Sequence, residues 1–70
     1  MIDKKLLKAK IRMIAIRENG LNFISGGDAY VLNVKVFKDH VTADVILIEG
    51  DKRDRVNNCE FTFKELGVKE

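Results

Sequence analysis

The sequence predicts an α+β fold, in which one N-terminal helix packs on an antiparallel meander of three or four strands. The main observation is that the spacing of apolar residues changes once, near Asn19-Gly20, from a helical period to strict alternation. The second is that two alternating segments are separated by the short polar stretch Asp39-His40, as in a hairpin. At 70 residues the chain is expected to be a single small domain.

The helix is expected over residues 3–18. Asp3 can cap its start, and Gly20 with Leu21 is typical of its end. A competing interpretation makes residues 11–17 a strand that turns at Asn19-Gly20, but the side chains of the segment favour a helix. The stripe expected to face the sheet consists of Ile2, Leu6, Ala9, Met13 and Ile16, and a second stripe about 140° round the helix consists of Leu7, Ile11 and Ile14.

Three strands are expected over residues 29–38, 41–49 and 55–64, because apolar and polar side chains alternate there. If Asp39-His40 is a two-residue turn, Val36 faces Ala43 and Lys35 faces Asp44. The predicted core face of the sheet consists of Tyr30, Leu32, Val34, Val36, Ala43, Val45, Leu47, Cys59, Phe61 and Phe63.

The opposite face of this sheet is more apolar than a solvated face should be. It would carry Val31, Phe37, Ile46, Ile48 and Val56. Either the sheet curls toward a barrel, with residues 21–25 as an additional short strand over this patch, or another molecule covers it.

Composition argues against several classes of protein. The single cysteine, Cys59, permits no internal disulfide, and with His40 as the only histidine neither a zinc centre nor a cofactor is expected. The longest apolar runs are four residues, residues 13–16 and 45–48, which is too short for a membrane span or a signal peptide. We therefore expect a cytoplasmic protein.

Catalysis is not expected either. His40 beside Asp39 could act as a general base, but a nucleophile would have to come from elsewhere. Cys59 alternates with Phe61 and Phe63, which places its thiol in the core. The acidic residues around the turn at 49–55 are interleaved with three basic ones, so they do not resemble a cation-binding loop.

Charge is distributed unevenly. Residues 1–17 hold six basic residues against one acidic residue, while the whole chain has a net charge of only +2. Lys4, Lys8 and Arg12 are spaced to follow one side of the helix, which is the basis of a nucleic-acid-binding hypothesis. A membrane-surface helix is less favoured, because the helix has no Trp or Phe anchor.

The function expected first is a non-enzymatic protein-binding, accessory or inhibitory module that associates with itself as a homodimer. A small domain cannot easily cover all of this apolar surface alone. The interface candidates are Leu7, Ile11, Ile14, Ile46 and Ile48.

Overall fold

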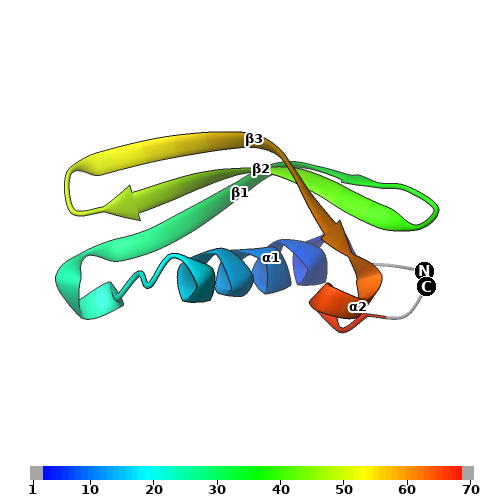
Figure 1. The fold of residues 1–70 in the computed structure, drawn as a ribbon, viewed down its shortest axis with the longest axis horizontal. Helices are drawn as coiled ribbons and strands as arrows, with labels where there is room; N and C mark the ends of the chain where they lie inside the picture. Colours follow the sequence, from blue (N-terminus) through cyan, green and yellow to red (C-terminus); the bar gives the residue numbers. More distant parts are fainter. Residues whose placement is uncertain (1–2, 69–70) are drawn as a thin grey trace.

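The computed structural model describes residues 3–68 and has the predicted α+β architecture. Its elements are α1 (Lys4–Glu18), the short 3₁₀ helix η1 (Phe23–Ser25), β1 (Gly27–Val36), β2 (His40–Glu49), β3 (Lys52–Thr62) and the one-turn helix α2 (Phe63–Leu66). The three strands form an antiparallel meander in the order β1-β2-β3, which arches over α1 (Figure 1). The sheet is open, so of the two alternatives the curl toward a barrel does not occur, and residues 21–25 contain the 3₁₀ helix η1 instead of an additional strand.

The ends of α1 confirm the predicted start and stop signals. The Asp3 carboxylate accepts a hydrogen bond of 2.9 Å from the backbone N–H of Lys5. At the other end, Gly20 adopts a φ of 63°, and the N–H of Leu21 donates to the carbonyl of Ile16 at 3.0 Å. This left-handed cap favours glycine, and it ends the helix one turn before η1. The alternative hairpin over residues 11–25 is therefore wrong.

The sequence pattern predicts the wrong apolar stripe of α1 to face the sheet. Leu7 and Ile11 have no exposed area and lie in the centre of the core, whereas Leu6 is 47% exposed and Met13 is 50% exposed. Ile16 is buried, as expected. Ala9 is exposed, and Ile2 lies outside the described residues.

A polar contact accompanies this rotation of α1. The Arg12 guanidinium donates from Nε to the carbonyl of Ala29 at 3.1 Å and from Nη2 to Asp28 Oδ1 at 2.7 Å. Arg12 follows Ile11 directly, about 100° round the helix, so this contact is compatible with Ile11 facing the sheet. Burial of Leu7 and Ile11 contributes the larger free energy, because a partly exposed ion pair contributes little to stability.

The strand register also differs from the predicted one. The first hairpin turns at residues 38–39, so Val36 pairs with Val41 and Lys35 pairs with Thr42. The register then shifts between Leu32 and Lys35, and Leu32 pairs with Asp44. A second shift lies in β3, opposite Ala43 to Val45 of β2. Each shift is a β-bulge, in which one strand carries an additional residue and bends more strongly.

Both bulges contain an asparagine with positive φ, 53° at Asn33 and 56° at Asn58. Asparagine is among the few non-glycine residues that adopt this conformation readily. The Asp44 carboxylate, on the central strand between them, accepts from Asn33 Nδ2 at 2.8 Å and from the backbone N–H of Asn58 at 3.0 Å. Arg55 Nη2 adds a third contact at 3.1 Å. Asp44 thus holds the two bends of the sheet together.

These contacts lower the pKa of the Asp44 carboxyl, through the hydrogen bonds from Asn33 and Asn58 first and the Arg55 contacts next. Because the folded state favours the ionised form, Asp44 stabilises the fold at neutral pH, and this contribution is lost as the pH falls below about 4 through the folded-state pKa. We expect Asp44→Asn to lower the melting temperature at pH 7. The difference from wild type should shrink when melting is followed down to about pH 2. If the difference in melting temperature between Asp44→Asn and wild type stayed constant over that range, the ionised Asp44 carboxylate would not be the source of the stabilisation.

The bulges change which residues face α1. In β1, Ala29 and Val31 face the core while Tyr30 and Leu32 lie on the outer, convex face, which reverses the prediction for this half of the strand. In β3, Val56 pairs with Val45 and therefore lies on the core side rather than on the outer face. The buried core consists of Leu7, Ile11, Ala15, Ile16, Ala29, Val31, Val34, Val41, Ala43, Val45, Phe61 and Leu66.

Candidate functional site

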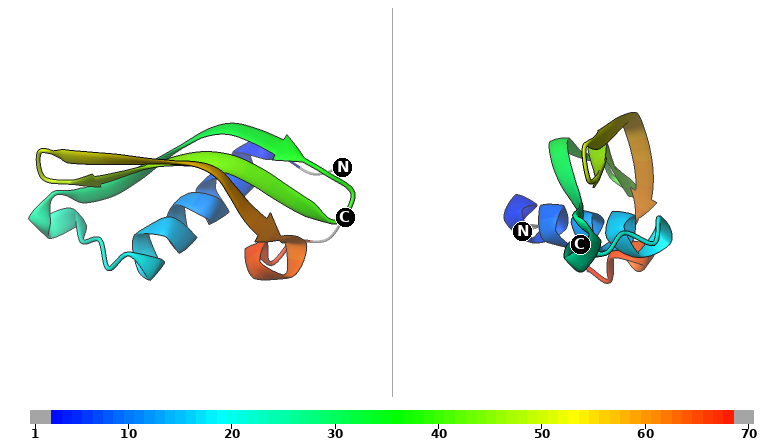
Figure 2. Two further views of the ribbon diagram at one scale, coloured as in Figure 1. Left: turned by 45° about the horizontal axis from the view of Figure 1, so that its top comes forward. Right: turned by 90° about the vertical axis from the view of Figure 1, so that its left-hand side faces the viewer.

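An apolar groove lies on the concave side of the sheet, between α1 and β3. The helix packs mainly on β1 and only partly on β2, so the concave face around Val56 on β3 stays uncovered, whereas Phe61 farther along β3 is buried. The two views in Figure 2 show the sheet arching away from the helix. The groove has a volume of about 220 Å³, and its lining residues are Ala15, Glu18, Asn19, Val45, Leu47, Val56, Cys59 and Phe61.

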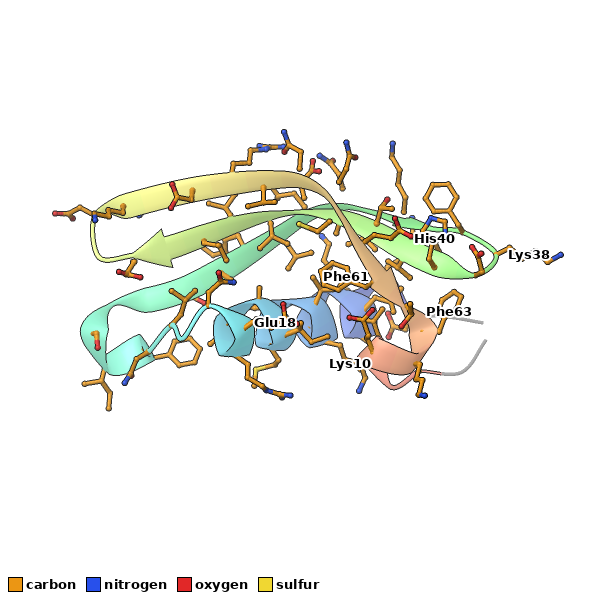
Figure 3. All side chains as sticks on the ribbon, in the orientation of Figure 1. Lys10, Glu18, Lys38, His40, Phe61 and Phe63 are labelled. Carbon is orange, nitrogen blue, oxygen red and sulfur yellow. The ribbon has the colours of Figure 1, made fainter. Side chains whose placement is uncertain are left out.

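Val56 is the most exposed apolar side chain of this groove. It is 45% exposed although it lies on the same face as the buried Val45. Phe61 lies between the sheet and α1 and closes the other end of the apolar floor (Figure 3). Val56 therefore lies on the core side of the sheet but remains exposed, because α1 does not extend over this part of β3.

The groove has one charged lining residue, Glu18, at the C-terminal end of α1. Glu49, Lys52 and Asp54 line a neighbouring hollow that shares Asn19 and Leu47 with the groove. The free edge of β3 has no neighbouring strand among the described residues, and it carries Arg53 and Arg55 on its outer face. Charges and a bulge on an edge strand disfavour pairing with a further strand.

The predicted basic track along α1 is only partly free. Lys4 and Lys8 are exposed. Arg12 is engaged with Asp28 and Ala29, and its guanidinium also lies 5.4 Å from the centroid of the Phe23 ring. The pKa of the Asp28 carboxyl is lowered by the backbone N–H of Ala29 and then by Arg12. Arg12 thus has a structural role in orienting α1, whether or not it meets a phosphate.

The five interface candidates lie on opposite sides of the sheet, three in α1 on the concave side and two in β2 on the convex side. Leu7 and Ile11 are in the core and have no surface to offer. Ile14 is half-buried beside α2. Ile46 and Ile48 lie on the convex face, Ile48 buried and Ile46 half-buried in register with Tyr30 and Arg55. The structure brings no more than two of them to one exposed surface.

His40 is not a turn residue but the first residue of β2. Its Nδ1 lies 2.6 Å from the Asp39 carboxylate, and its ring stacks on Phe37 with centroids 4.7 Å apart. Contact with His40 lowers the pKa of the Asp39 carboxyl. The pair lies near the hairpin tip (Figure 3). Cys59 is on the other face of the sheet, so it does not join His40 in one site.

The sequence pattern predicts Cys59 in the core; it lies on the core side of the sheet but is only half-buried, at the wall of the groove. Burial and, to a smaller extent, the charge of Asp44 raise the pKa of its thiol. A raised pKa reduces the thiolate fraction, and with it the nucleophilicity of the sulfur. Within residues 3–68 no three His, Cys, Asp or Glu side chains are grouped so as to hold a metal ion.

In the part of the chain that the structure describes, no helix is both long and apolar enough to cross a membrane. No protein-family model matches the sequence, and neither a curated protein nor a solved structure was found to be similar to it.

Proposed function

We propose that the protein is a non-catalytic binding module that associates with a second copy of itself through the groove between α1 and β3. The observation that carries this proposal is Val56, an apolar side chain on the core face of the sheet that α1 leaves 45% exposed. A partner that covered it would complete the concave half of the core. Burial of apolar area is the main favourable contribution to such an association.

We propose a second copy as the partner, because the protruding side chain and the hollow that could receive it lie on the same surface. Val56 lies on β3 at the rim, and Ala15, Leu47 and Cys59 form the hollow beside it. About a two-fold axis, Val56 of each copy can enter the hollow of the other. Such an interface is self-complementary and closes at two subunits.

Sedimentation velocity over a concentration series up to about 100 μM tests this proposal, since micromolar affinity populates dimers at that concentration. We expect wild type to become heavier with concentration and Val56→Glu to remain a folded monomer. Val56 is 45% exposed in one copy, so the substitution should leave the melting temperature nearly unchanged when both proteins are melted at a concentration too low for wild type to dimerise.

Ile46→Glu is the matched variant on the convex face, where the sequence pattern placed part of the interface. We expect it to dimerise like wild type. If Ile46→Glu gave the folded monomer and Val56→Glu did not, the interface would be on the convex face and the groove proposal would fail. A wild type that stayed monomeric at all concentrations would exclude self-association through either face.

A further inference from the structure

A second surface, on the side of α1 away from the sheet, is independent of the groove. It combines the outward side of α1 with η1, and we call it the sheet-distal face. Both elements lie below the sheet in Figure 1, and the end view in Figure 2 agrees. Its members are Leu6, Lys10, Met13, Arg17, Phe23 and Ile24.

The apolar members of this face project into solvent. Ile24 is 96% exposed and Phe23 is 57% exposed, both on η1, and Leu6 and Met13 are about half exposed on α1. The loop fixes the position of the two η1 residues. The Asn22 side chain accepts from the N–H of Ile24 at 2.9 Å, and Arg12 lies against the Phe23 ring. An almost fully exposed isoleucine on an ordered turn has no function in the core of this chain.

The charge of this face is positive. Lys5 borders its apolar members on one side of α1, and Lys10 and Arg17 border them on the other. Lys10 points away from the sheet in Figure 3. Among the described residues two carboxylates lie on this side, so basic residues outnumber acidic ones by three to two. They are Glu18, at the end of α1, and Glu65, which lines one hollow with Lys10 and Arg17. The Oε1 atom of Glu65 accepts hydrogen bonds from Thr62 in the cap of α2.

We propose that the sheet-distal face binds the surface of an anionic lipid bilayer, with Phe23 and Ile24 entering the headgroup region and the basic residues of α1 contacting lipid phosphates and carboxylates. Helices that lie on membranes combine basic and apolar side chains in this way. The expectation that membranes are not partners rested on the lack of an aromatic anchor in the helix. The fold supplies that anchor from η1, which packs beside Arg12 of α1.

A bilayer fits this face better than a nucleic acid does. The positive charge suits both, since both present phosphates. Ile24 and Met13 distinguish the two, because the phosphate backbone of a nucleic acid offers no apolar medium for an aliphatic side chain. A bilayer offers both anionic headgroups for the basic residues and an apolar medium for the aliphatic side chains.

The test is co-sedimentation of the full chain with vesicles. One set is pure phosphatidylcholine, and a second contains about one-third phosphatidylserine, which carries the negative surface charge of anionic leaflets. We expect binding to the second set only, weaker at high salt because exposed charges are screened. Replacing Lys10 and Arg17 with glutamine should weaken binding by about five-fold for each charge removed.

Ile24→Asp is the decisive variant, because a side chain that is 96% exposed can be changed without disturbing the fold. We expect it to abolish vesicle binding while its melting temperature stays that of wild type. Phe37→Asp is the matched control, since Phe37 is also an exposed loop residue but stacks on His40, on the far side of the sheet. It should bind vesicles like wild type.

Three results would overturn the proposal. These are equal sedimentation with neutral and anionic vesicles, no binding to anionic vesicles, and full binding by Ile24→Asp. An oligonucleotide that bound through Lys10 and Arg17 independently of Ile24 would assign the face to nucleic acid instead. Val56→Glu should bind vesicles like wild type, so a failure of the dimer and a failure of the membrane proposal are separable.

Discussion

Replacing Leu7 with alanine is expected to lower the free energy of unfolding by about 2–5 kcal/mol, because Leu7 has no exposed area and its removal leaves a cavity between α1 and the sheet. A domain of 70 residues has a net stability of only a few kcal/mol. The variant should therefore be close to unfolded at 25 °C, or melt about 10 °C or more below wild type.

Leu6→Ala is the matched control. It makes the same chemical change one residue earlier in the same helix, so any effect on helix propensity is shared. Leu6 is 47% exposed, and its truncation should cost less than about 1 kcal/mol. Thermal or urea unfolding of both variants measures the difference. If Leu6→Ala were the more damaging, α1 would present its other stripe to the sheet and the rotation seen in the structure would be incorrect.

The sequence pattern was sufficient to predict α1 but not its rotation. The stripe with Leu6 and Met13 and the shorter stripe with Leu7 and Ile11 both have the helical period of 3.6 residues, so the period alone cannot show which of them faces the sheet. The rotation that the chain adopts buries Leu7 and Ile11 and places Arg12 beside Asp28, 16 residues away in the chain. Arg12 is one of six basic residues in α1, and nothing in the sequence distinguishes it from the other five before the fold is known.

The strands were predicted correctly in number and order, and the errors are in register. Strict alternation assumes that each residue has one partner, and each bulge breaks that assumption and reverses the facing of every residue beyond it. A signal was present, because Asn33, Asn57 and Asn58 interrupt otherwise strand-like segments and asparagine is depleted in strands. Treating these residues as bulges would have placed Tyr30 outside and Val56 inside.

The two candidate surfaces could not be predicted for related reasons. The groove exists because Val56 lies beyond the second bulge and because α1 covers only part of the sheet. The sheet-distal face depends on residues 23–24, which the sequence pattern assigned to a strand, yet which form a 3₁₀ turn beside α1. In both cases the informative residue is a single apolar side chain whose direction depends on a local irregularity of the backbone.

Phe61 carries the second large expected effect, since it is the only aromatic side chain buried in the described core. It pairs with Val41 on β2, and its ring also forms part of the groove floor. Phe61→Ala should cost about 3–5 kcal/mol and leave little folded protein. Phe63, predicted as an equal partner, begins α2 and is only half-buried, so Phe63→Ala should cost clearly less.

The difference between the two phenylalanines tests the path of the chain at the end of β3. If β3 continued as a regular strand through residue 64, as the sequence pattern predicts, Phe61 and Phe63 would share one face and their alanine variants would be similarly unstable. The structure ends the strand at Thr62, where the capping box with Glu65 starts α2, so that Phe63 belongs to the helix and packs only partly buried against the core. Urea unfolding of the two variants decides the matter. Equal losses of stability would mean that the strand continues and that α2 does not form.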